Sequence, residues 1–340
     1  MKAAMTEIVG NDALKSRLAQ DILDHKLPHA LILEGARGSG KHTIALSCAA
    51  ALACTEHKNQ SAPIPCLCCP DCKKILEKKS PDVIVIGTED KATIGVDTVR
   101  FLKEDVHTVP NDLDHKIYII EDADKMTPQA QNALLLTLEE PPSYVQFFLL
   151  CKNAELLLET IRSRAPVLRT EPLAPEDIDA YLVAHDTRAA QMKLANPKDY
   201  AELLKASGAG IGQAIDYLAP GAFAPILEKR RLAAEIVNTA IAHRDMIPLL
   251  LRFSQKRNEC REQLLYLLDA LRDLILLKKS ETVTLCFYVD RDEAIELCDR
   301  VSLPFLYHFF EAVQAALDAN ARNANVRLLL LRMLSDAHVL

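Results

Sequence analysis

A glycine-rich loop between two apolar segments is the feature that most constrains the fold of this chain. The run "ALILE" (30–34) leads into "GARGSGK" (35–41), and the alanine-rich segment 41–54 follows. A strand, a glycine loop and a helix in this order form a phosphate-binding loop, in which backbone N–H groups and a lysine contact phosphate oxygens. The alternative is a structural turn that holds no ligand. The residues that would contact phosphate are Gly35, Gly38, Gly40 and Lys41.

The residue after the lysine departs from the pattern of an active loop. An active loop carries Ser or Thr there, because that hydroxyl binds Mg²⁺. This chain has His42, and a neutral imidazole is a poor ligand for a cation that prefers oxygen. Thr43 lies about 100° further round the predicted helix, so it does not simply replace the missing hydroxyl. We therefore expect weak binding of ATP and Mg²⁺.

Two acidic residues follow the apolar run 116–120, and they predict the other half of the same pocket. The expected order is an aspartate near Mg²⁺ and then a glutamate that orients the attacking water. This chain has Glu121 and then Asp122, so each carboxylate is displaced by one methylene. A misplacement of about 1 Å can cost on the order of 100-fold in rate. The alternative is an acidic turn that ends a strand.

Two further polar residues bear on ATP hydrolysis. Asn153 ends a predicted strand, where a polar side chain would sense the γ-phosphate. Gln213 begins a predicted helix, where an active ATPase of this kind would often carry an arginine, and an amide cannot neutralise phosphate charge. The predicted pocket therefore keeps its loop, while magnesium coordination, water activation and phosphate sensing are all weakened.

Apolar runs alternate with helical segments up to about residue 169. This alternation predicts a parallel sheet with helices on both faces. The remaining sequence is rich in Leu and Ala at helical spacing. The expected fold is thus α/β plus all-α, with an α/β domain at 1–169, a small helical domain at 170–218 and a larger helical domain at 219–340. Expected strands are 30–35, 81–87, 115–124 and 145–153.

Four of the ten cysteines predict a metal site. Cys66, Cys69 and Cys72 are spaced C-x₂-C-x₂-C, and Cys54 lies upstream. Four thiolates can hold a structural Zn²⁺ in a closed tetrahedral site. Cys68 and His57 are alternative ligands, and the other interpretations are buried free thiols or a redox pair. Buried, reduced thiols are expected at Cys48, Cys151, Cys260, Cys286 and Cys298.

Charge and hydropathy narrow the class of protein. The formal net charge is −7, which argues against a surface that coats nucleic acid. The short charged runs 73–79 and 228–235 are interpreted as solvated helix faces. No apolar run reaches the roughly 20 residues of a membrane helix, and the first residues lack a signal-peptide core. We expect a cytoplasmic protein.

Three motifs resemble bacterial clamp-loader proteins of the AAA+ class, which serve DNA polymerase III. They are "LPHALILEGARGSGK" (27–41), "IYIIEDADKMTPQAQNALLLTLEEPP" (117–142) and "LLETIRSRA" (157–165), and the segment 317–334 resembles the family's final helix. The resemblance implies an AAA+ P-loop module with an inserted zinc module at 54–72, a helical lid and a helical collar. It also implies a five-membered ring with clamp-loader ATPase subunits and a delta subunit, and action on a sliding clamp and primed DNA.

The resemblance assigns a role to one arginine. Ser163 and Arg164 resemble the family's Ser-Arg-Cys motif, whose arginine reaches the γ-phosphate held by the next subunit. A guanidinium suits that role because it is planar, permanently charged and bidentate. The alternative is a surface arginine paired with Glu159 or another acid, and Arg162 is the less favoured candidate.

Three functions are consistent with these features. The leading hypothesis is a non-hydrolysing clamp-loader subunit that donates Arg164 to a neighbouring ATPase. The second is an active AAA+ ATPase that tolerates His42, Glu121 and Asp122. The third is a P-loop phosphotransferase unrelated to replication.

Overall fold

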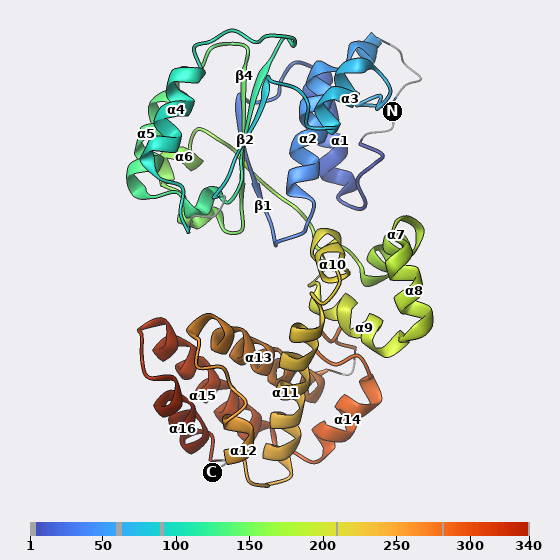
Figure 1. The fold of residues 1–340 in the computed structure, drawn as a ribbon, viewed down its shortest axis with the longest axis vertical. Helices are drawn as coiled ribbons and strands as arrows, with labels where there is room; N and C mark the ends of the chain where they lie inside the picture. The colour runs from blue at the N-terminus through green and yellow to red at the C-terminus, as the bar shows by residue number, and fades with distance from the viewer. Residues whose placement is uncertain (1–4, 59–62, 89–91, 209, 281, 339–340) are drawn as a thin grey trace. The chain divides into compact units, whose positions relative to one another are not determined.

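The computed structural model describes residues 5–58, 63–88, 92–208, 210–280 and 282–338, except for the side chains of residues 57 and 58. The chain divides into two compact units (Figure 1). The first contains residues 1–181 and 209–212, and the second contains residues 182–208 and 213–340. The three-domain division expected from the sequence stays a prediction.

The first unit is built on a five-stranded parallel sheet in the order β2-β3-β4-β1-β5. The predicted parallel sheet is therefore confirmed, with each expected strand shortened at its ends. The short fifth strand was not expected, because its three residues carry too little pattern. The bounds are β1 (Ala30–Glu34), β2 (Val83–Ile86), β3 (Lys116–Ile120), β4 (Val145–Cys151) and β5 (Val167–Arg169).

Helices cover both faces of this sheet (Figure 1). Leu31 and Leu33 of β1 pack in the core on one face, whereas Ala30 and Ile32 pack in the core on the other, because successive strand residues point to opposite faces. The first face is covered by α1 (Asp12–Leu23), α2 (Lys41–Ala53) and α3 (Pro70–Leu76). The second is covered by α4 (Val96–Asp105), α5 (Pro128–Glu139) and α6 (Glu159–Arg162).

The rest of the chain is helical, as the Leu- and Ala-rich sequence predicts. Within the described residues no helix is both long and apolar enough to cross a membrane. The helices are α7 (Pro175–His185), α8 (Thr187–Ala195), α9 (Pro197–Ala206), α10 (Ile211–Tyr217), α11 (Ala224–Ile241), α12 (Ile247–Leu250), α13 (Arg257–Lys279), α14 (Arg291–Asp299), α15 (Leu303–Ala321) and α16 (Val326–Asp336). Short 3₁₀ turns occupy Thr55–Lys58, Ala123–Lys125 and Ala154–Leu156.

Two expectations about single residues in the second unit were wrong. Cys286 is exposed, because it lies in the irregular segment before α14 and not in a helical core. Arg230 lies in a run expected to be solvated, yet it is 3% exposed. Its Nε donates to Glu202 Oε2 at 2.6 Å and its Nη2 to the Phe287 carbonyl at 2.5 Å. A buried charge needs such partners, so Arg230 joins α9, α11 and the segment before α14.

Candidate functional site

The glycine loop lies between the end of β1 and the start of α2, as predicted. Gly38 and Gly40 have φ angles of 78° and 85°, a left-handed conformation that favours glycine. Gly35 has a different constraint, because a Cβ there would lie 1.9 Å from Thr170 Oγ1. The three predicted glycines are therefore required by the backbone path of the loop.

The lysine of the loop points back to the loop itself. Lys41 Nζ donates to the carbonyl oxygens of Gly35, at 2.7 Å, and Ala36, at 2.6 Å. Burial lowers the pKa of Lys41. The ammonium that would meet phosphate is thus held by backbone carbonyls of its own loop.

A second glycine-rich segment packs directly on the loop. Gly212 N–H donates to the Gly38 carbonyl over a long 3.4 Å. A Cβ on Gly210 would lie 2.7 Å from the Arg37 carbonyl oxygen and 2.9 Å from the Gly38 carbonyl carbon. Backbone therefore meets backbone here, and the contact covers part of the loop. The glycines of "GAGIG" (208–212) were the only sequence sign of this approach.

The two residues expected near the magnesium position, His42 and Glu121, contact each other. His42 Nδ1 lies 2.6 Å from Glu121 Oε1. The contact with His42 is the main cause that lowers the pKa of Glu121, against the opposite effect of burial. Thr43 is exposed at the start of α2. An imidazole nitrogen thus faces the carboxylate where Mg²⁺ would need oxygen ligands, so these residues do not fit the metal.

The second acidic residue also has a local partner. Asp122 Oδ2 accepts a hydrogen bond from Lys125 Nζ at 2.8 Å. Burial acts to raise the pKa of Asp122, but the hydrogen bond and charge of Lys125 outweigh it and the pKa is lowered. Asp122 has a φ of 49°, so the backbone turns sharply at this position. The carboxylate expected to orient a water is therefore bonded to a lysine of the same turn.

Asn153, the predicted phosphate sensor, bonds to its own segment, and so does Gln213, which stands where an active ATPase would often carry an arginine. Asn153 Oδ1 accepts from the Glu155 N–H at 2.9 Å and so caps the turn after β4. Gln213 Nε2 donates to the Tyr217 hydroxyl at 2.5 Å. Sequence reasoning found the residues around the loop, but it gave no sign of these contacts.

Arg164 lies just after α6 and is partly exposed, with 33% of its side chain accessible. Its Nη2 donates to Glu139 Oε1 at 2.6 Å, and its Nη1 donates to the Thr160 carbonyl at 2.9 Å. The acid that pairs with it within the chain is thus Glu139, at the end of α5, and not Glu159. The guanidinium is held at the surface of the first unit.

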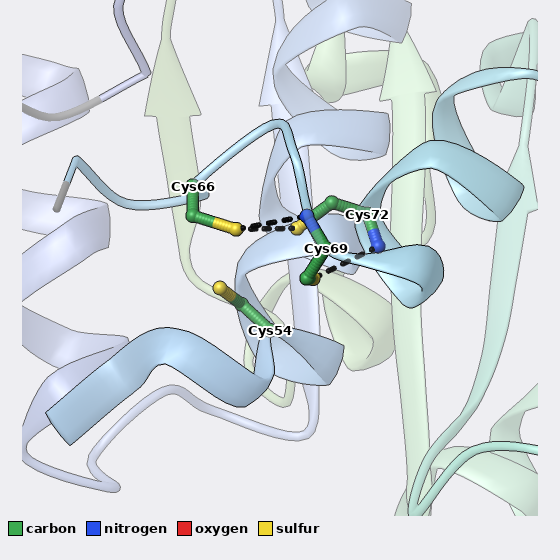
Figure 2. Close-up of side chains that lie close together, drawn as sticks. All are labelled: Cys54, Cys66, Cys69 and Cys72. Atoms are coloured by element: carbon green, nitrogen blue, oxygen red, sulfur yellow. Dashed lines mark hydrogen bonds between the residues drawn. The ribbon is translucent and has the colours of Figure 1, made fainter. Parts of the chain in front are cut away.

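The four predicted metal ligands converge. The sulfur atoms of Cys54, Cys66, Cys69 and Cys72 all lie within 4.8 Å of one another, and the four residues are buried. Figure 2 shows their side chains pointing toward one another. Cys69 N–H donates to Cys66 Sγ at 3.3 Å and Cys72 N–H to Cys69 Sγ at 3.4 Å. Backbone donors of this kind stabilise thiolates, so the cluster fits a tetrahedral Zn²⁺.

One of the alternative ligands can be placed, and it does not join the cluster. Cys68 is exposed and stands outside it, and the side chain of His57 lies outside the described residues. Burial acts to raise the pKa of Cys66, yet backbone N–H groups of Cys69 and Cys68 hold it at about 6. The pKa of Cys66 is thus lowered toward the thiolate form that binds zinc, whereas burial raises the pKa values of Cys54 and Cys72.

The sheet order, the glycine loop after β1 and the acidic turn after β3 define the class of protein. The first unit is a P-loop α/β domain of the AAA+ kind. Its strands are parallel, so the loop and the acidic turn both lie at the carboxyl ends of the strands.

Comparison with known proteins shows which proteins the chain resembles. Residues 10–174 match the family described as DNA polymerase III, delta subunit. The chain is 33% identical over 177 residues to DNA polymerase III subunit delta' of Bacillus subtilis, covering 52% of each protein. It is 35% identical over 159 residues to DNA polymerase III subunit gamma/tau of Mycoplasma pneumoniae, covering 47% of this chain and 22% of that protein. Residues 10–174 therefore resemble subunits of DNA polymerase III.

The extent of these matches is limited. The chain spans about half the length of the delta' relative and less of the gamma/tau relative. Among solved structures, a DNA polymerase III gamma subunit-related protein from Thermotoga maritima is 20% identical with a TM-score of 0.41, over 95% of this chain and 97% of that one.

Proposed function

We propose that the chain is a delta-prime-like subunit of a DNA polymerase III clamp loader. It does not hydrolyse ATP efficiently, and it supplies Arg164 to the nucleotide of a neighbouring ATPase subunit. Its partners are the clamp-loader ATPase subunits and a delta subunit in a five-membered ring, which loads a sliding clamp onto primed DNA. The sequence relationship of residues 10–174 to delta' and gamma/tau subunits supports this role.

One observation carries the non-hydrolysing part of the proposal: the contact between His42 and Glu121. Phosphoryl transfer depends mainly on positioned charge, with Mg²⁺ bridging the phosphate oxygens. In this pocket the carboxylate faces an imidazole, and Lys41 is bonded to loop carbonyls. Both groups would have to break these contacts before they could act on ATP.

The exposed edge of the Arg164 guanidinium supports the donor role. An arginine supplied to a neighbouring subunit must reach the protein surface, and such a residue can contribute about 10³–10⁵ in rate. The test is Arg164→Ala in the complex reconstituted with its cognate ATPase subunits, clamp and primed DNA. We expect the melting temperature of the chain to change little and the stimulated ATPase rate to fall by about 100-fold or more. Unchanged turnover would refute the assignment.

The four-cysteine cluster is proposed to hold a structural zinc ion. Its ligands would be Cys54, Cys66, Cys69 and Cys72, which lie between the end of α2 and the first turn of α3. Four protein ligands leave no open position for a water or a substrate. The metal would therefore fasten the segment between these helices and take no part in catalysis.

The alternative function is an active AAA+ ATPase subunit. The identity to gamma/tau subunits favours it, because it is as high as the identity to delta'. ATP turnover by the isolated chain separates the two functions. The match of residues 10–174 to polymerase III subunits gives no support to an unrelated phosphotransferase.

A further inference from the structure

The guanidinium of Arg164 is held by acceptors from two different helices. Glu139 is the last residue of α5, and Thr160 lies in α6. Ser163 Oγ lies at 3.4 Å from Nη1 as a third, weaker acceptor. A guanidinium has five N–H donors, so these three contacts leave two donors for another acceptor.

We propose that Glu139 is a positioning residue that orders Arg164 before it meets the neighbouring subunit's nucleotide. This inference rests on the proposed function of Arg164. An arginine side chain has many rotamers, and ordering it costs conformational entropy. A contact that already orders the side chain removes this cost from the step in which the arginine meets phosphate.

The weakness of the ion pair excludes the opposite role, in which Glu139 would hold the arginine back. Both side chains are partly exposed, 33% for Arg164 and 45% for Glu139, and water and salt screen such pairs. A triphosphate offers several negative charges and bidentate oxygens to the same guanidinium. Glu139 can therefore bias the orientation of Arg164 without competing with a phosphate for it.

The next residue in the chain provides a matched control. Glu140 is exposed and ends the same helix, so its removal changes the charge by the same amount at nearly the same place. The two single variants thus separate a general loss of negative charge from the loss of one contact. Glu139→Gln is the conservative variant, because its amide oxygen can still accept a hydrogen bond from Arg164.

The experiment measures kcat and KM for ATP of the reconstituted complex carrying full-length variants. We expect Glu139→Ala to lower kcat about three- to fivefold, the effect of an exposed ion pair, with KM changed less than about twofold. Glu139→Gln should recover most of the loss, and Glu140→Ala should match the wild type. In an Arg164→Ala background, Glu139→Ala should have no further effect, because it acts only through that arginine.

Three outcomes would overturn the inference: an unchanged or raised kcat for Glu139→Ala, an equal loss for Glu140→Ala, or an added loss in the Arg164→Ala background. If Glu139→Ala also lowers the melting temperature of the chain, the Arg164→Ala background decides, because a folding defect would lower kcat there as well. Full activity of Arg164→Ala alone would instead refute the proposed function.

Discussion

Two candidate ligand sites lie at opposite ends of α2, and they differ in the contacts that their side chains make. At the start of the helix, Lys41 bonds to carbonyls of its own loop and His42 contacts Glu121. Just after its end, Cys54 joins three other thiols that converge within 4.8 Å. At the first site Lys41 has acceptors in its own loop and His42 lies against a carboxylate, whereas the four thiols at the second share a common centre.

This difference follows from the chemistry of the side chains. An ammonium, an imidazole and carboxylates are strong hydrogen-bonding groups, so they pair with one another when no ligand separates them. Thiols are weak hydrogen-bond donors and acceptors. The contact between the Cys66 and Cys72 sulfur atoms, at 3.9 Å, therefore stabilises the cluster less than bonds to a metal would. We therefore expect the cysteine cluster to bind a metal and the pocket at the loop to bind MgATP weakly.

The largest effect is expected at the cysteine cluster. Cys69→Ser should abolish stoichiometric zinc and lower the melting temperature of the chain strongly, because structural zinc binding in finger peptides contributes about 10–16 kcal/mol. Metal analysis and thermal unfolding measure the two consequences. Cys68→Ser is the matched control and should retain the metal, since Cys68 is exposed and outside the cluster. Full zinc content in Cys69→Ser would contradict the four-ligand site.

The second prediction concerns substitutions that should strengthen the binding of MgATP in the pocket. The triple variant His42→Thr, Glu121→Asp, Asp122→Glu restores the oxygen ligand and the usual order of the acids. We expect ATP to bind at least about tenfold more tightly in Mg²⁺ than in EDTA, because hard oxygen ligands then face the cation. Titration calorimetry measures this ratio, with the wild type as control. An unchanged ratio would contradict this expectation. It would indicate that the packing of residues 210–212 on the loop, and not the altered side chains, weakens the binding of MgATP.

The smallest effect concerns pH. The pKa of Glu121 is lowered from its ordinary value of 4.5, mainly by its contact with His42. A carboxylate with a lowered pKa stabilises the fold above its unfolded pKa, and this contribution is lost as the pH falls through the folded pKa. Because the Glu121 side chain is 43% exposed, the contribution is below about 1 kcal/mol.

Thermal unfolding of the wild type and of Glu121→Gln between pH 7 and pH 4 measures this term. The wild type should be slightly more stable at pH 7, and the difference should shrink toward pH 4. A difference that is constant over this range would mean that the charge of Glu121 does not stabilise the pocket.

Much of the fold and of the two sites was predictable from local sequence. Buried parallel strands read as continuous apolar runs, so β1, β3 and β4 were found from "ALILE", "KIYII" and "VQFFLLC". The C-x₂-C-x₂-C spacing identified three sulfurs of the cluster, and the glycine pattern identified the residues of the loop.

What could not be predicted depends on contacts between distant segments. The Glu139–Arg164 pair joins residues 25 positions apart, and the helical pattern of neither segment indicates it. The same holds for the packing of Gly210 against the loop and for the burial of Arg230, which is set by Glu202 and the Phe287 carbonyl. The strand β5 was missed because three residues give no periodicity.

The central claim is the proposal that the pocket at the glycine loop does not hydrolyse ATP. The most direct test is the rate of MgATP hydrolysis by the purified full-length chain, with Lys41→Ala as the control. The mutual pairing of its polar groups predicts that the two proteins show the same background rate. A wild-type rate that saturates with ATP, requires Mg²⁺ and disappears in Lys41→Ala would contradict it.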